Sequence, residues 1–75
     1  MHNYFIRYRY RQGNKTSLDV FRQDGDSLLE ATKTAEQKFK AQGMEYEILY
    51  VIDVSDQTAE MVSNLDDVYR QYFIS

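Results

Sequence analysis

The side chains that most often perform catalysis or bind metals are scarce in this chain. It contains no cysteine and a single histidine, His2, at a chain end, where residues usually fray. Histidine-based acid–base catalysis and Cys/His metal sites are therefore not expected. The three glycines fall at predicted turns or a helix end rather than in a phosphate-binding loop. We expect a protein that is not an enzyme, with no catalytic residue, metal or cofactor.

Carboxylates are the remaining source of reactive or metal-binding groups. Asp24-Gly25-Asp26 resembles part of a calcium loop, but the other oxygen ligands and the closing glutamate are missing. A turn followed by a helix cap explains this segment better. The later carboxylates form a candidate acidic surface for a basic partner, although they also serve solubility. These are Asp53, Asp56, Glu60, Asp66 and Asp67.

Arginines alternate with aromatic residues near the start of the chain, and charge is unevenly distributed. Residues 1–22 carry five basic and one acidic side chain, whereas residues 23–75 carry four basic and eleven acidic ones. An arginine and aromatic face would contact phosphates and stack bases, as in single-strand binders. Alternatively, the arginines pair with acidic residues on neighbouring strands, which the acidic pI of about 4.9 favours. The candidate binding residues are Arg7, Arg9, Arg11, Phe5 and Phe21.

The first two elements that position these residues are predicted to form a hairpin. Residues of about 3–11 and 17–22 alternate between apolar and polar side chains, which is typical of strands. A two-residue loop at Gly13-Asn14 would mix charged and apolar side chains on both faces. We therefore expect an odd-length loop centred on Asn14, which pairs Arg9 with Asp19.

A helix, a strand and a second helix are predicted to follow. Ser27 and Glu30 form a capping box that begins a helix over about 27–42, and Gly43 ends it. Residues of about 45–54 are apolar on both faces, which predicts a central strand. Helical spacing continues over about 57–73. A break at Asn64, with a separate short helix from Leu65 to Phe73, and an extended end over Tyr72-Phe73-Ile74 remain alternatives.

These elements predict one small α+β domain spanning residues 1–75. The order is strand, strand, helix, strand, helix, with a mostly antiparallel three-stranded sheet and both helices packed on one face. The direction of the third strand is left open. The composition, with 43% hydrophobic and 28% charged residues, is that of a folded globular domain.

Function is expected to lie in what the surfaces bind. In size, charge and element order the chain is similar to many small phage or mobile-element accessory proteins, including inhibitors of host defence, a resemblance that assigns no residue roles. We expect a protein-binding inhibitor or adaptor. A nucleic-acid binder and a homodimer built on the seven Tyr and four Phe are alternatives. No stretch predicts membrane insertion and no signal peptide is recognised, so a cytoplasmic location is expected.

Overall fold

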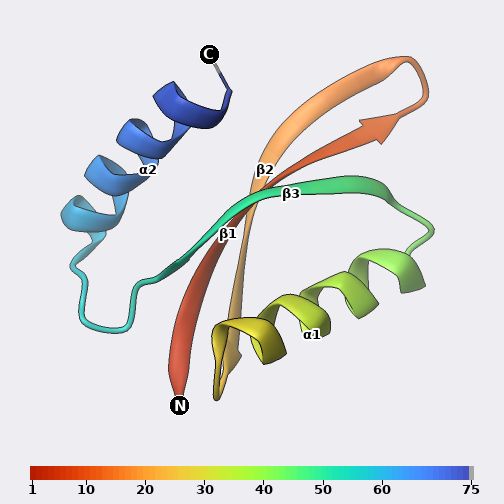
Figure 1. The fold of residues 1–75 in the computed structure, drawn as a ribbon. Helices are drawn as coiled ribbons and strands as arrows, with labels where there is room; N and C mark the ends of the chain where they lie inside the picture. Colours follow the sequence, from red (N-terminus) through yellow and green to blue (C-terminus); the bar gives the residue numbers. More distant parts are fainter. Residues whose placement is uncertain (75) are drawn as a thin grey trace.

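The computed structural model describes residues 1–74 and contains one three-stranded sheet and two helices. The strands are ordered β2-β1-β3, and both neighbours run antiparallel to β1 (Figure 1). This confirms the predicted α+β class and element order, and it shows that the third strand is antiparallel. The elements in chain order are β1 (His2–Gln12), β2 (Lys15–Gly25), α1 (Leu28–Ala41), β3 (Glu45–Asp53) and α2 (Ala59–Phe73).

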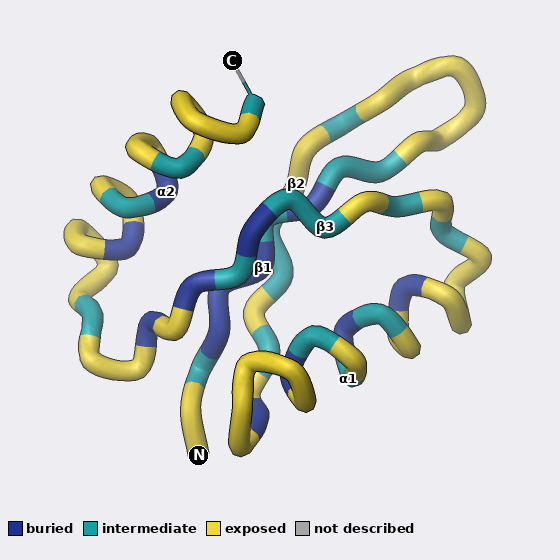
Figure 2. Tube along the Cα trace, viewed as in Figure 1, coloured by how far each residue is buried: buried dark blue, intermediate teal, exposed yellow. Residues whose placement is uncertain are grey.

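The central strand is β1, and β3 lies at an edge of the sheet. The prediction that residues 45–54 form the central strand was therefore wrong. A strand is apolar on both faces whenever both faces of its sheet are covered, even if only one side has a neighbouring strand. The clearer signal was in β1, where Tyr4, Phe5 and Ile6 are consecutive and all buried (Figure 2).

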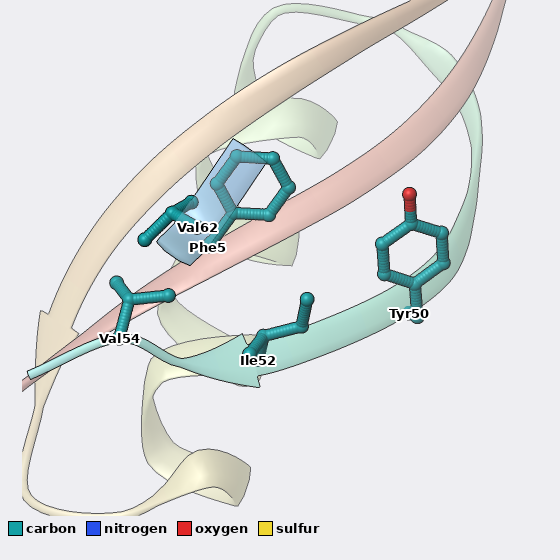
Figure 3. Close-up of a cluster of buried hydrophobic side chains, with 5 residues drawn as sticks. All are labelled: Phe5, Tyr50, Ile52, Val54 and Val62. Atoms are coloured by element: carbon teal, nitrogen blue, oxygen red, sulfur yellow. The ribbon is translucent and has the colours of Figure 1, made fainter. Parts of the chain in front are cut away.

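The two helices cover opposite faces of the sheet, whereas the sequence analysis expected both on one face. Successive side chains of a strand point to opposite faces. Phe5 accordingly packs in a cluster with Val62 of α2 (Figure 3), while Ile6 packs in a second cluster with Ala35 and Phe39 of α1. A thin sheet with apolar residues on both sides of its central strand needs a cover on each side.

The β1–β2 hairpin turns at Gly13-Asn14, so the predicted odd-length loop was wrong. Arg9 lies opposite Leu18, and Gln12 opposite Lys15. Gly13 has a φ of 62°, as expected at the first central position of a type II′ turn. This register mixes charged and apolar side chains on each face of the hairpin. The mixing is tolerated because Leu18 stays 41% exposed.

Both helices begin at side-chain caps. The Ser27 hydroxyl accepts a hydrogen bond from the Glu30 backbone N–H at 3.1 Å, which confirms the predicted start of α1. Gly43, with a φ of 68°, follows the end of α1, as predicted. Thr58 caps α2, which continues unbroken through Asn64 to Phe73 and so confirms a single second helix. Among residues 1–74, neither helix combines the length and apolar character that a membrane span requires.

Candidate functional site

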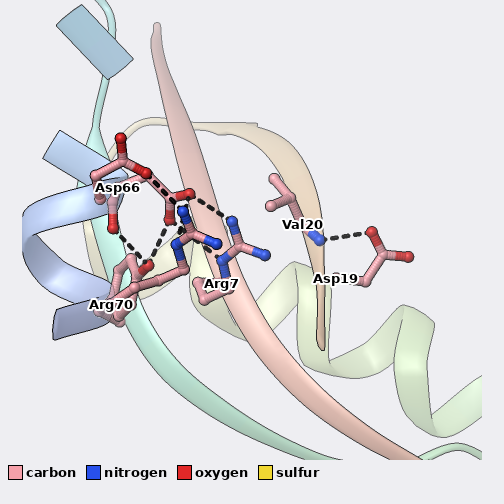
Figure 4. A network of polar contacts seen from close by, with 7 residues as sticks. Arg7, Asp19, Val20, Asp66 and Arg70 are labelled. Carbon is pink, nitrogen blue, oxygen red and sulfur yellow. Dashed lines mark hydrogen bonds and ion pairs between the residues drawn. The ribbon is translucent and has the colours of Figure 1, made fainter. Parts of the chain in front are cut away.

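The three arginines of β1 occupy different environments. Arg7 lies beneath α2, where its Nε and Nη2 donate hydrogen bonds to Asp66 Oδ1 and Oδ2 at 3.2 and 2.5 Å (Figure 4). The Nη2 of Arg9 pairs with Oε1 of Glu47 on β3 at 2.7 Å. The Nε of Arg11 donates to the Gly13 carbonyl at 3.2 Å. The predicted alternative of cross-strand pairing therefore occurs for Arg9, while Arg7 pairs with a residue of a helix.

The contact between Arg7 and Asp66 is almost fully shielded from water. Their side chains are 12% and 11% exposed. The Tyr50 hydroxyl of β3 donates to Asp66 Oδ1, and the half-exposed Arg70 approaches Asp66 Oδ2 at 3.6 Å. Among the described residues, no buried side-chain nitrogen or oxygen lacks a hydrogen-bond partner. The network therefore joins β1 and β3 to α2 without leaving a buried charge uncompensated.

This network sets the protonation of its members. Burial alone would raise the pKa of Asp66, but hydrogen bonds from Arg7 and Tyr50, together with the charges of Arg7 and Arg70, hold it below its usual value. Burial and the hydrogen bond to Asp66 raise the pKa of Tyr50 to about 12. At neutral pH, Arg7 and Asp66 are therefore charged and Tyr50 is neutral. These protonation states suit a structural anchor between the sheet and α2.

The two aromatic residues predicted to act with the arginines lie on opposite faces of the sheet. Phe5 belongs to the cluster beneath α2. Phe21 packs against Phe39 of α1, with ring centroids 5.4 Å apart. The structure therefore does not bring Arg7, Arg9, Arg11, Phe5 and Phe21 together on one exposed surface.

The predicted acidic residues are also divided. Asp66 is buried, and Asp67 pairs with Arg70 at 2.5 Å between Oδ1 and Nη2. Asp53 Oδ2 lies 3.1 Å from His2 Nδ1, and its Oδ1 accepts hydrogen bonds from Ser55. These hydrogen bonds from Ser55, together with the nearby His2, lower the pKa of Asp53. Asp53, Asp56, Glu60 and Asp67 are exposed and only Asp66 is buried, so the exposed acidic set is one residue smaller than predicted.

Sequence reasoning missed an apolar stripe on the outside of α2. The apolar residues of this segment were used only to predict a helix, whereas the structure divides them between two rows. One row, with Val62, Asp66 and Tyr69, faces the sheet. The other turns outward and consists of Met61, Leu65, Val68 and Tyr72, which we call the α2 stripe. Met61, Val68 and Tyr72 are 47%, 50% and 83% exposed.

The spacing of apolar residues carried a signal for this division. Residues 61, 65, 68 and 72 lie on a single helical row, and residues 62, 66, 69 and 73 lie on the next. A helix with two adjacent apolar rows has more apolar surface than one sheet contact can bury. Leu65 marks the border, since it is half-buried against the core cluster.

The other flank of α2 faces β2. An open surface hollow there is lined by Leu18, Asp67, Arg70, Gln71 and Ile74. Arg70 lies nearly opposite the α2 stripe around the helix axis, at about 100° per residue. The stripe therefore turns away from β2.

No group of three or more His, Asp or Glu residues within positions 1–74 is arranged to hold a metal ion.

Comparison of the chain with protein-family models found no match. Comparisons with curated protein sequences and with solved structures also found none.

Proposed function

We propose that this chain is a non-enzymatic protein-binding module, acting as an inhibitor or adaptor, and that α2 is its binding element. The supporting observation is the α2 stripe, where Met61, Val68 and Tyr72 expose about half or more of their surface. Contiguous exposed apolar residues are typical of interaction sites. Methionine and tyrosine are also enriched in protein interfaces, while charged residues are depleted at their centres.

The geometry favours protein binding over nucleic-acid binding. Phosphates would have to compete with Asp66 for Arg7 and with Glu47 for Arg9. Breaking a buried pair leaves an unpaired charge and is costly. Phe5, which the hairpin face would offer to a base, is only 7% exposed and cannot serve as a stacking platform. Within the α2 stripe, by contrast, the exposed side chains need no rearrangement to contact another protein.

Affinity capture with matched variants tests this proposal. We expect proteins retained by the unmodified chain to persist after nuclease treatment and to be lost with Val68→Glu. Leu29→Glu on α1 is the matched control, since Leu29 is 61% exposed and lies on the other helix. Loss of all retained material on nuclease treatment would contradict the proposal. So would equal retention by Val68→Glu and Leu29→Glu, because the stripe would then have no role.

A further inference from the structure

We infer that Asp19 guards the free edge of the sheet at β2 against the addition of another strand, because it holds the Val20 backbone N–H in a hydrogen bond of its own. The strand that this guard keeps away is the same edge of a second copy of the chain. The edge lies apart from the α2 stripe, so the guard does not depend on the proposed role of α2.

The free edge of β2 is long and regular. β2 pairs with β1 without a break from Lys15 to Gly25, and no strand lies on its other side. The other edge strand, β3, is interrupted by a shift in register next to Tyr8 of β1, and such irregularities spoil an edge for pairing. A long, unbroken edge strand is a template for strands of other molecules unless something blocks it. β2 is therefore the edge that needs protection.

The hairpin turn determines which backbone groups of β2 face the free edge. Because Gln12 and Lys15 close the two-residue turn, odd-numbered residues of β2 bond to β1, and even-numbered residues direct their N–H and C=O groups outward. The bond from the Val54 N–H to the Asn3 carbonyl agrees with this alternation, since odd-numbered residues of β1 face β3. The Val20 N–H therefore lies near the middle of the free edge.

Two side chains of β2 already bond to these outward groups. Asp19 Oδ1 accepts a hydrogen bond from the Val20 N–H at 2.7 Å (Figure 4). Gln23 Nε2 donates to the Asp24 carbonyl at 2.9 Å, and Lys38 of α1 donates to Gln23 Oε1 at 2.7 Å. An incoming strand would have to replace the bond to the carboxylate with one to a neutral carbonyl, which is weaker.

Asp19 is also the one charged residue in the most strand-prone part of β2. Between Lys15 and Arg22 the sequence is Thr-Ser-Leu-Asp-Val-Phe. Without the aspartate, this six-residue segment would combine high β propensity with no charge and no Pro or Gly, which is the composition of segments that stack through their edges. Natural sheets place charged residues in such segments to block pairing. The guard and the hazard therefore coincide in one short stretch.

The carboxylate of Asp19 is not used in the ion pair that the sequence predicted for it. Arg9, the predicted partner, lies opposite Leu18 and pairs with Glu47 on β3. Asp19 itself is exposed. Its bond to the Val20 N–H is thus made at the edge, where an incoming strand would have to approach.

Sedimentation velocity over a range of protein concentrations tests the guard. We expect Asp19→Ala to form larger species at concentrations at which the unmodified chain forms none, and to gain the infrared amide I band of intermolecular strands. Asp19→Asn should sediment like the unmodified chain, because its side-chain carbonyl still accepts from the Val20 N–H. Asp26→Ala removes the same charge from an exposed position outside β2 and should cause no added association.

A proline in the free edge separates edge pairing from the association of unfolded chains. Leu18 is 41% exposed and directs its N–H outward, so Leu18→Pro removes an outward donor without breaking a bond to β1. The double variant Leu18→Pro/Asp19→Ala should therefore sediment like the unmodified chain. Circular dichroism and thermal unfolding check that each variant is folded at the temperature of the measurement.

Each outcome supports or overturns the guard. Association of a folded Asp19→Ala variant that Leu18→Pro reverses supports it. The guard is overturned if Asp19→Ala associates no more than the unmodified chain, or if association persists in the folded double variant. Equal association of Asp19→Ala with Asp19→Asn or with Asp26→Ala also overturns it, because the hydrogen bond to Val20 would then have no role. Partner capture by α2 is measured separately with Val68→Glu, which leaves β2 unchanged.

Discussion

Arg7 and Asp66 bring two opposite charges into contact in a place that water scarcely reaches. Removing ions from water is costly, so such a pair is stable only when both charges are well bonded. Here Arg7 donates to both carboxylate oxygens, and Tyr50 donates to one of them. The pair fixes where α2 lies on the sheet. Removing one partner should leave the other charge buried and poorly compensated.

We expect Arg7→Met to destabilise the fold by about 3–5 kcal/mol, because it leaves Asp66 buried with weaker compensation. The double variant Arg7→Met/Asp66→Leu should recover most of that loss, since it removes both buried charges. Urea denaturation gives the unfolding free energies, and the wild type with the two single and the double variants completes a double-mutant cycle. A double variant as unstable as the sum of the singles would mean that the two residues do not act as a pair.

The lowered pKa of Asp66 predicts how acid affects stability. The unfolded chain binds a proton at Asp66 at a higher pH than the folded chain does, so the stabilisation is complete above the ordinary pKa of about 3.9. It is lost as the pH falls through the lower folded value. Asp53 adds a loss of the same sign. We expect Asp66→Asn to show a shallower loss of unfolding free energy below about pH 4 than wild type; parallel curves would contradict this.

Single residues of the site were easier to predict than their contacts. Arg7 and Asp66 were both selected from the sequence, but they were assigned to separate surfaces of opposite charge. They are 59 positions apart, and a contact over that distance depends on which face of the sheet α2 covers. The network also depends on Tyr50, which the sequence pattern placed only as a strand residue. Local patterns specify residue types well, but they do not specify tertiary partners.

At the scale of elements, local chemistry predicted what it directly controls. Ser27, Glu30 and Gly43 predicted both ends of α1, because caps act over a few residues. The predicted hairpin register was wrong because the two faces of these strands do not separate polar from apolar residues. The glycine at the first turn position carried the stronger constraint. Apolar content likewise could not distinguish an edge strand with both faces covered from a central one.

The end of β2 and the start of α1 approach each other closely at Gly25. A Cβ at this position would lie 3.0 Å from both the Cβ and the backbone nitrogen of Ala31. Because one of these atoms belongs to the helix backbone, the contact is not relieved by a side-chain rotation. We expect Gly25→Ala to lower the unfolding free energy by about 1–3 kcal/mol. Thermal unfolding measures it, and Asp26→Ala, at the exposed next position, should stay within about 0.5 kcal/mol of wild type.

For the whole molecule, the two faces of the sheet are covered in different ways. On one side, α1 places Ala31, Ala35 and Phe39 against the sheet, each at most 2% exposed. On the other, α2 places Val62 and the charged Asp66 there and keeps its second apolar row outside. The sequence shows that both helices are amphipathic, but which apolar row is buried depends on how the layers stack.

This asymmetry predicts that α2 is the element that opens most easily. Regions with little buried apolar surface open at lower free energy than the core. The buried residues of α2 are Val62 and the charged Asp66, whereas those of α1 are all apolar. Native-state hydrogen exchange should show α2 amides opening well below the global unfolding free energy, with β1 and α1 amides near it. Arg7→Met should lower the α2 opening energy further, because it removes the ion pair between β1 and α2. Equal protection of α2 and β1 would contradict this difference between the two faces.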